Sequence, residues 1–141
     1  MRLSLDNISF AIPVSGALYN GSLNLLDKCG LSVSRPNDRV YTANMPSLQG
    51  VDIIFQRQSD IPSRLDSNVA DIGVVGLDSF YEKKIDNGNS IVIIDDLGFG
   101  SSDMVLAVPE AWLDVKSLAD LADLSFEMRE KGKDLRIATK Y

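Results

Sequence analysis

The segment from Asp60 to Asp78 constrains the fold most, because it combines a helix start, an apolar strand and a glycine turn. Asp60 can cap a helix through its carboxylate, and Pro62 suits the first helical turn. We expect this helix to end near residues 67–68. Residues 72–75 are apolar on both faces, which predicts a short parallel strand in the middle of a sheet. The segment therefore indicates an α/β fold.

Residues around this predicted strand are candidates for binding a ligand. Gly73 leaves room for a neighbour beside the strand, and Gly76 can adopt a positive φ or let a ligand approach the backbone. Asp71 enters the strand and Asp78 follows the turn. In open α/β sheets, ligands bind outside the carboxyl ends of the strands, where Gly76 and Asp78 are expected. A buried strand that ends in glycine is also ordinary α/β architecture, so a purely structural role is an open alternative.

Composition and charge limit the class of protein and of ligand. The 141 residues are 45% hydrophobic and 24% charged, which is typical of a globular domain with a real core. The net charge of -6 argues against nonspecific nucleic-acid binding, which needs a basic surface. An anionic small ligand stays open, because helix N-termini and a few arginines can hold phosphate locally.

The absence of histidine excludes the commonest catalytic arrangements. It removes the usual general base and the Ser-His and Cys-His nucleophile pairs. The single cysteine, Cys29, adds no basis for a zinc site and is expected as a small core residue on the apolar side of a helix. The chain shows neither a signal-peptide pattern nor an apolar run near the roughly 20 residues of a membrane span. We therefore expect a cytoplasmic protein without a membrane partner.

Two further predicted strands have candidate residues at their carboxyl ends. Residues 8–13 form a predicted strand, followed by a Ser/Gly loop and an apolar helical stripe over residues 18–29 that closes at a glycine. This shape can hold a phosphate or carboxylate at the helix N-terminus. Residues 51–57 are β-branched and apolar, and this strand carries Arg57 to its carboxyl end. Arg39 lies in a turn-rich loop, and either arginine alone could be a solvated surface cation.

The rest of the chain continues the alternation of strands and helices. We expect strands at 40–43, 90–94, 104–108 and 135–139, a short helix at 80–82, and an amphipathic helix at 115–131 with Ser117 as N-cap and Gly132 at its end. The character of the sequence changes near Asp103. We expect residues 1–102 to form a first lobe and residues 103–141 to begin a second lobe that is truncated.

Five segments resemble ATP phosphoribosyltransferase, the enzyme that opens histidine biosynthesis, in the order of that family. They are residues 12–18 (IPVSGAL), Arg57 with residues 60–62, residues 70–78 (ADIGVVGLD), residues 96–100 (DLGFG) and residues 136–141 (RIATKY). ADIGVVGLD and DLGFG are the specific ones. The resemblance implies two lobes like those of type II periplasmic binding proteins, a mixed and mostly parallel sheet, and an active site in the cleft between the lobes.

The resemblance also implies a reaction and a set of site residues. N1 of ATP attacks C1 of phosphoribosyl pyrophosphate and displaces Mg²⁺-bound pyrophosphate, which needs mainly positioning and charge neutralisation. A chain without histidine fits this chemistry. Arg57 is expected to face a phosphate, and Asp71 to hydrogen-bond a ribose or base. The substrate- and nucleotide-binding residues matched by position or motif are Gly16, Arg39, Arg57, Asp60, Asp71, Gly76 and Asp78.

The sequence also departs from the family pattern. The family usually has a lysine at one of the positions of Val14 and Ser15, often an arginine at Ala17, and a cysteine with a basic residue at Ser102 and Asp103. These changes remove positive charge where phosphates are expected. In the family, the loop that holds phosphoribosyl pyrophosphate lies beyond the segment matched by residues 136–141. We therefore expect a fragment of the enzyme that is inactive by itself.

The resemblance further implies partners, and a second reading stays open. The family's enzymes are homo-oligomers, and some short forms need a regulatory subunit resembling a histidyl-tRNA synthetase. The alternative is a non-catalytic lobe that binds a nucleotide or small metabolite in a periplasmic-binding-protein-like module.

Overall fold

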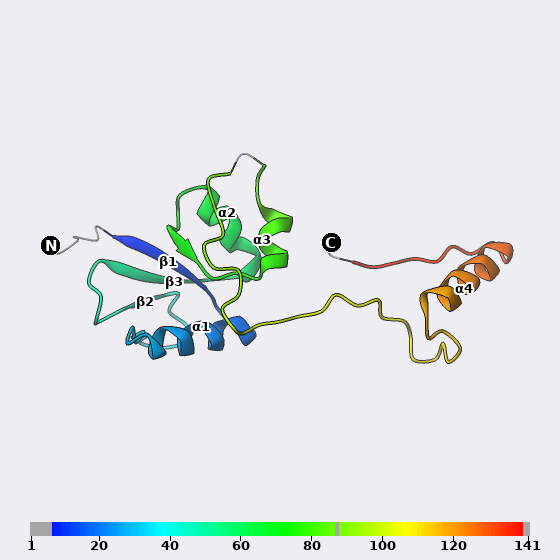
Figure 1. Ribbon diagram of the computed structural model, residues 1–141, viewed down its shortest axis with the longest axis horizontal. Helices are drawn as coiled ribbons and strands as arrows, with labels where there is room; N and C mark the ends of the chain where they lie inside the picture. The colour runs from blue at the N-terminus through cyan, green and yellow to red at the C-terminus, as the bar shows by residue number, and fades with distance from the viewer. Residues whose placement is uncertain (1–6, 87, 140–141) are drawn as a thin grey trace. The chain divides into compact units, whose positions relative to one another are not determined.

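In the computed structural model, which describes residues 7–86 and 88–139, the chain separates into two units between Ser101 and Ser102 (Figure 1). The first unit contains a four-stranded sheet with helices on it. The second contains one long helix and two extended segments. Each unit is described by itself.

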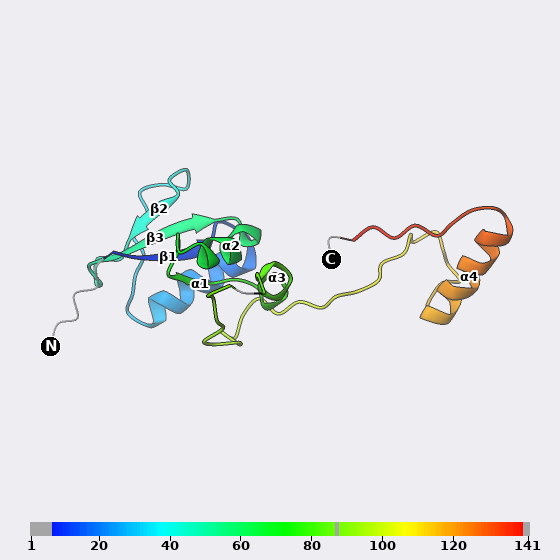
Figure 2. The ribbon, with the colours of Figure 1, turned by 90° about the horizontal axis from the view of Figure 1, so that it is seen from above.

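The sheet of the first unit has the strand order β2-β3-β1-β4. It is built from β1 (Ile8–Pro13), β2 (Thr42–Asn44), β3 (Val51–Gln56) and β4 (Ile72–Gly73). β1 pairs in parallel with both β3 and β4, whereas β2 pairs antiparallel with β3. β1 and β3 run side by side in both views (Figures 1 and 2). The prediction of an α/β fold with a mixed, mostly parallel sheet is confirmed.

Helices cover both faces of this sheet, because alternate residues of the central strands are apolar on both sides. Ile12, Ile53 and Phe55 belong to the larger core cluster, against which residues of α1 (Gly16–Lys28) pack. Ala11 and Ile54 belong to the opposite cluster, which is completed from α2 (Ile61–Asp66) and the segment before β4. α3 (Leu77–Lys83) lies beside α2 (Figure 1).

Several local predictions in this unit are confirmed. α2 has Pro62 in its first turn and ends before Ser67, as expected. α1 ends before Gly30, whose φ of +73° suits glycine at a helix C-terminus. At Gly73 an added Cβ would lie 2.7 Å from Cγ2 of Ile61, so the missing side chain leaves room for α2 to pack on the strand.

The second unit contains α4 (Leu118–Glu130), whose N-cap is Ser117 as the sequence predicted. Oγ of Ser117 accepts a hydrogen bond from the amide of Asp120, and the Asp120 carboxylate accepts from the amide of Lys116 at 2.9 Å. These bonds satisfy amides at the start of the helix. The Lys116 amide, together with the Ser117 hydroxyl that donates to the same carboxylate at 2.8 Å, holds the pKa of Asp120 below its usual value. Gly132 follows the helix with a φ of +70°.

Five predictions about strands need correction. β2 begins at Thr42 rather than at residue 40. The expected central strand over residues 72–75 is the two-residue β4, at one end of the described sheet. Within the described part of the chain, residues 90–94, 104–108 and 135–139 form no strand. All three segments are apolar and extended in character, but a strand also requires a neighbouring backbone to bond, and these segments have no ladder with another described segment.

Two predictions about single side chains are also wrong. Cys29 is exposed, because it is the C-cap residue of α1 and lies past the stripe that packs on the sheet. Asp60 does not cap α2 through its carboxylate: among the described residues, no amide of α2 donates to it. The 3-10 turn η1 (Gln58–Asp60) leads directly into α2, so Asp60 already has helical backbone angles.

None of the described helices is long and apolar enough to cross a lipid bilayer.

Candidate functional site

The carboxyl ends of β1, β3 and β4 lie along one edge of the sheet, because these three strands are parallel. The turn after β1 leads to Gly16, β3 leads directly to Arg57, and β4 is followed by Gly76 at the start of α3. The loop before β2 reaches the same edge, since the amide of Phe55 donates to the carbonyl oxygen of Tyr41 at 2.8 Å. Four chain segments therefore meet at this edge.

Six of the seven sequence-predicted site residues belong to these segments. Arg39 lies two residues before Tyr41, and the amide of Asp60 donates to the carbonyl oxygen of Arg57 at 2.9 Å. Asp78 lies in the first turn of α3. We call the six residues the carboxyl-edge cluster: Gly16, Arg39, Arg57, Asp60, Gly76 and Asp78.

The start of α1 offers backbone donors to this edge. Ser15 is the N-cap with extended backbone, and its side chain makes no capping hydrogen bond with the described residues. The first turn of α1 carries no acidic side chain. Gly16 has a φ of +83°, which strains any residue with a Cβ, and apart from its chain neighbours and its own helix backbone no described atom lies within 4 Å of where a Cβ would be. The positive end of the helix dipole is therefore open at this point.

Two exposed arginines add positive charge. Arg57 follows the last residue of β3, and Arg39 lies in the exposed loop before β2. Within residues 7–86 and 88–139, neither guanidinium forms an ion pair. Their charge is thus available to a ligand, as the prediction for Arg57 requires.

A third arginine, which the sequence left without a role, holds the loop of Arg39 in place. The Arg35 side chain is 9% exposed and donates to the carbonyl oxygens of Asp38 (2.7 Å) and Val40 (2.9 Å). Its guanidinium carbon lies 4.0 Å from the ring centroid of Phe55, in a cation–π contact. The neighbouring Pro36 and Asn37 predict a turn, but no local pattern indicates that Arg35 would pack on an aromatic ring of β3.

Gly76 brings β4 and η1 close together. An added Cβ at Gly76 would lie 2.5 Å from Oδ1 of Asp78 and 2.6 Å from Nε2 of Gln58. Nε2 of Gln58 also donates to Oγ of Ser79 at 3.3 Å. The φ of Gly76 is -65°, so of the two reasons for glycine that the sequence left open, a positive φ does not apply here. Gln58 thereby links the turn after Arg57 to the start of α3, a role that only its position beside Arg57 could have suggested.

Asp71 lies at the other edge of the sheet. Its carboxylate accepts a hydrogen bond from the amide of Ser9 at 2.8 Å, and its own amide donates to the carbonyl oxygen of Ser9 at 2.9 Å. Ser9 is the second residue of β1, so this contact is at the amino ends of the strands. The structure therefore does not bring Asp71 together with the carboxyl-edge cluster.

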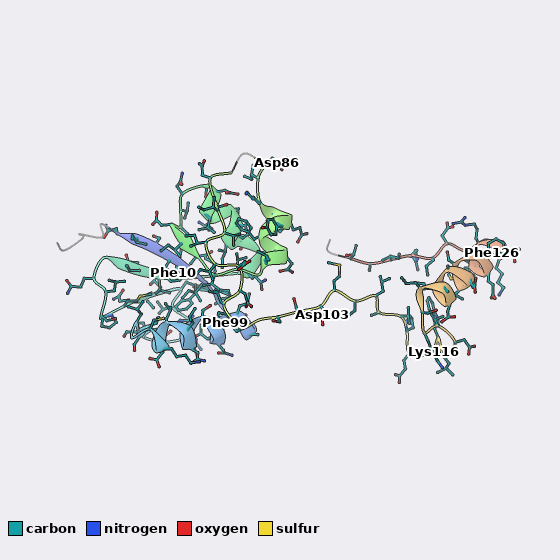
Figure 3. All side chains as sticks on the ribbon, viewed as in Figure 1. Phe10, Asp86, Phe99, Asp103, Lys116 and Phe126 are labelled. Carbon is teal, nitrogen blue, oxygen red and sulfur yellow. The ribbon has the colours of Figure 1, made fainter. Side chains whose placement is uncertain are left out.

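The DLGFG segment, residues 96–100, packs on α1. The Phe99 ring occupies the space where a Cβ of Gly21 would be, and Leu18 does the same for Gly100. Figure 3 labels Phe99 near α1. The amide of Gly98 donates to Oδ1 of Asp96 at 2.7 Å, which closes the turn. A segment distant in sequence thus lies beside the first turns of α1.

The described residues do not form a metal site. No three His, Cys, Asp or Glu side chains among them come together in a way that could hold a metal ion. The second unit has an open groove between α4 and its two extended segments, lined mainly by apolar residues such as Met104, Leu121 and Ile137. None of the seven sequence-predicted residues lines this groove.

Comparison with known proteins gives the chain its family. Residues 57–141 match the family model described as HisG: ATP phosphoribosyltransferase. The chain is 42% identical over 136 residues to an ATP phosphoribosyltransferase of Mesorhizobium japonicum, covering 95% of the chain and 59% of the relative. The matching enzyme of Brucella anthropi is 40% identical over 137 residues, covering 96% and 59%. The chain thus spans about 59% of the length of these relatives, and the matches do not favour the non-catalytic alternative. This chain belongs to the ATP phosphoribosyltransferase family.

Proposed function

We propose that this chain is part of an ATP phosphoribosyltransferase, a glycosyltransferase that condenses ATP with phosphoribosyl pyrophosphate to give phosphoribosyl-ATP and pyrophosphate. This is the first step of histidine biosynthesis. The family match over residues 57–141 carries the proposal, since it includes both ADIGVVGLD and DLGFG. The similarity to relatives over 95–96% of the chain supports it.

We further propose that residues 1–102 form the first lobe of a type II periplasmic-binding-protein-like fold and that residues 103–141 begin the second lobe. The mixed, mostly parallel sheet with helices on both faces supports this assignment. In such folds ligands bind at the carboxyl ends of the strands, which is where the carboxyl-edge cluster lies. Cytoplasmic localisation follows from a role in amino-acid biosynthesis.

In the proposed reaction the residues of the carboxyl-edge cluster bind and orient the nucleotide. Arg57 neutralises a phosphate, and the amides at the start of α1 donate to phosphate oxygens because Gly16 leaves that helix end open. Arg39 adds a second cation on the neighbouring loop. Gly76, Asp60 and Asp78 border the same edge, where carboxylates can accept from ribose hydroxyls or amino groups. Asp71 stays outside this site, because its carboxylate is engaged at the opposite edge.

These groups suit a displacement in which the protein supplies position rather than covalent chemistry. N1 of ATP carries the attacking electron pair, C1 of the phosphoribosyl group accepts it, and pyrophosphate leaves with the electrons of the broken bond. Binding both substrates in line lowers the entropic part of the barrier. The family resemblance implies Mg²⁺ bound with the substrate, but the described acidic residues form no site for the ion, so no step is assigned to it.

The proposal extends to partners. A homo-oligomer is the assembly that the family resemblance implies, and a regulatory subunit resembling a histidyl-tRNA synthetase is the candidate protein partner. Size-exclusion chromatography with light scattering, with and without that subunit, tests both.

A binding and an activity measurement test the function. Thermal unfolding of this chain with ATP, AMP or single amino acids should show stabilisation by the nucleotides only. The protein made from its complete coding sequence should form phosphoribosyl-ATP from ATP and phosphoribosyl pyrophosphate. Stabilisation by amino acids without a nucleotide effect, together with no product, would reject the proposal in favour of a metabolite-binding module.

A further inference from the structure

Gly21 is an unusual residue for its position, in the interior of the 13-residue helix α1. Glycine there is less favourable than alanine, because it gives up more conformational freedom when the helix forms. The structure supplies a compensating contact. A Cβ at Gly21 would lie 2.5 Å from Cγ and 2.6 Å from Cε2 of Phe99, so any larger residue collides with the ring.

A second contact on the same helix face supports the first. Leu18 lies three residues before Gly21 and therefore on the same side of α1. Its Cδ2 occupies the space where a Cβ of Gly100 would be, and Gly100 has a φ of +76°. Phe99 and Gly100 thus both pack on one stripe of α1. Leu18 is two residues from Gly16, or about 3 Å along the helix axis, so the loop is held beside the carboxyl-edge cluster.

We propose that Gly21 is a positioning residue for nucleotide binding. Because Gly21 has no side chain, the Phe99 ring packs directly against α1 at this residue. This contact, which we call the seat, holds the backbone of residues 98–100 beside the start of α1. The inference rests on the proposed function and deepens it, because it assigns the DLGFG loop to the border of the nucleotide site. The residue that makes room for the Phe99 ring therefore belongs to α1 and not to the DLGFG loop.

Gly21→Ala in the protein made from its complete coding sequence tests the seat. Helix propensity alone predicts that this change raises the melting temperature and leaves ATP binding unchanged. Displacement of Phe99 predicts faster amide hydrogen exchange at residues 98–100 and a dissociation constant for ATP raised about tenfold, the effect of one lost hydrogen bond or its equivalent. Asn24→Ala, an exposed change on the same helix, is the matched control and should alter neither.

A double-mutant cycle separates the seat from a general effect on the helix. Once Phe99→Ala has removed the ring, adding Gly21→Ala should cause no further loss of ATP affinity. Independent, additive losses would overturn the inference, and so would normal exchange and affinity in Gly21→Ala. If the unmodified protein neither binds ATP nor turns it over, the proposed function fails and with it the nucleotide role. The exchange data at residues 98–100 then still decide whether Gly21 seats Phe99.

Discussion

Removing the guanidinium of Arg57 should weaken nucleotide binding without weakening the fold. Arg57 is exposed at the end of β3 and has no ion pair with a described residue, so Arg57→Ala should change the free energy of unfolding by less than about 0.5 kcal/mol. A hydrogen bond from a charged group is worth about 1.5–3 kcal/mol. If Arg57 binds a phosphate, the dissociation constant for ATP should rise by about 10- to 150-fold.

Isothermal titration of ATP, with urea unfolding in parallel, measures the two quantities. Arg64→Ala is the matched control, because Arg64 is an exposed arginine of α2 that lies outside the carboxyl-edge cluster. It removes the same charge and should leave ATP affinity nearly unchanged. The effect of Arg57→Ala should also shrink at high salt, which screens exposed charges. An unchanged dissociation constant, or an equal loss in both variants, would refute a specific phosphate contact.

Three further changes test other parts of the structure. Phe55→Ala removes a fully buried ring of β3 and should lower the free energy of unfolding in urea by about 3–5 kcal/mol; a loss below about 1 kcal/mol would contradict its place in the core. Asp71→Asn should lower stability through its contact with Ser9 but leave the ATP dissociation constant unchanged, whereas weaker ATP binding would return Asp71 to the site. The hydroxyl of Ser90 donates to Asp66 and holds the pKa of that carboxyl below its usual value of 3.8, so this contribution to stability is present above pH 3.8 and is lost as the pH falls through the lowered pKa. The difference in melting temperature between Asp66→Ala and the unmodified protein should therefore narrow in acid; a constant difference would argue against this contact.

Much of the local structure follows from short-range patterns. The apolar stripe of α1, the proline in α2 and the cap of α4 depend on residues within a few positions, so each was predicted from the sequence. The strand predicted over residues 51–57 is β3 for the same reason, since its β-branched and apolar residues favour strand structure. The strands that failed, at 90–94, 104–108 and 135–139, have suitable residues but no pairing partner among the described residues.

The candidate site likewise combines features that local sequence patterns predict with features that depend on contacts between distant segments. Gly16, Arg57 and Gly76 were candidates from the sequence because each comes after the carboxyl end of a predicted strand, and the parallel pairing of β1 with β3 and β4 brings them to one edge. The sequence does not fix the contact of Asp71 with Ser9, since this contact depends on which residues of β1 lie beside β4. The packing of Phe99 on Gly21 joins segments 78 residues apart in the chain, and no local signal marks it.

The sequence by itself determined the fold class and most helices, because these depend on composition, periodicity and residues a few positions apart, and its motifs carried the resemblance to the family. Tertiary structure alone decided that β4 ends the described sheet, that Asp71 lies at the amino edge and that Arg35 and Gln58 hold loops of the candidate site. The physical reason is that hydrogen bonding and close packing between distant segments depend on register and direction, which the pattern of one segment does not contain.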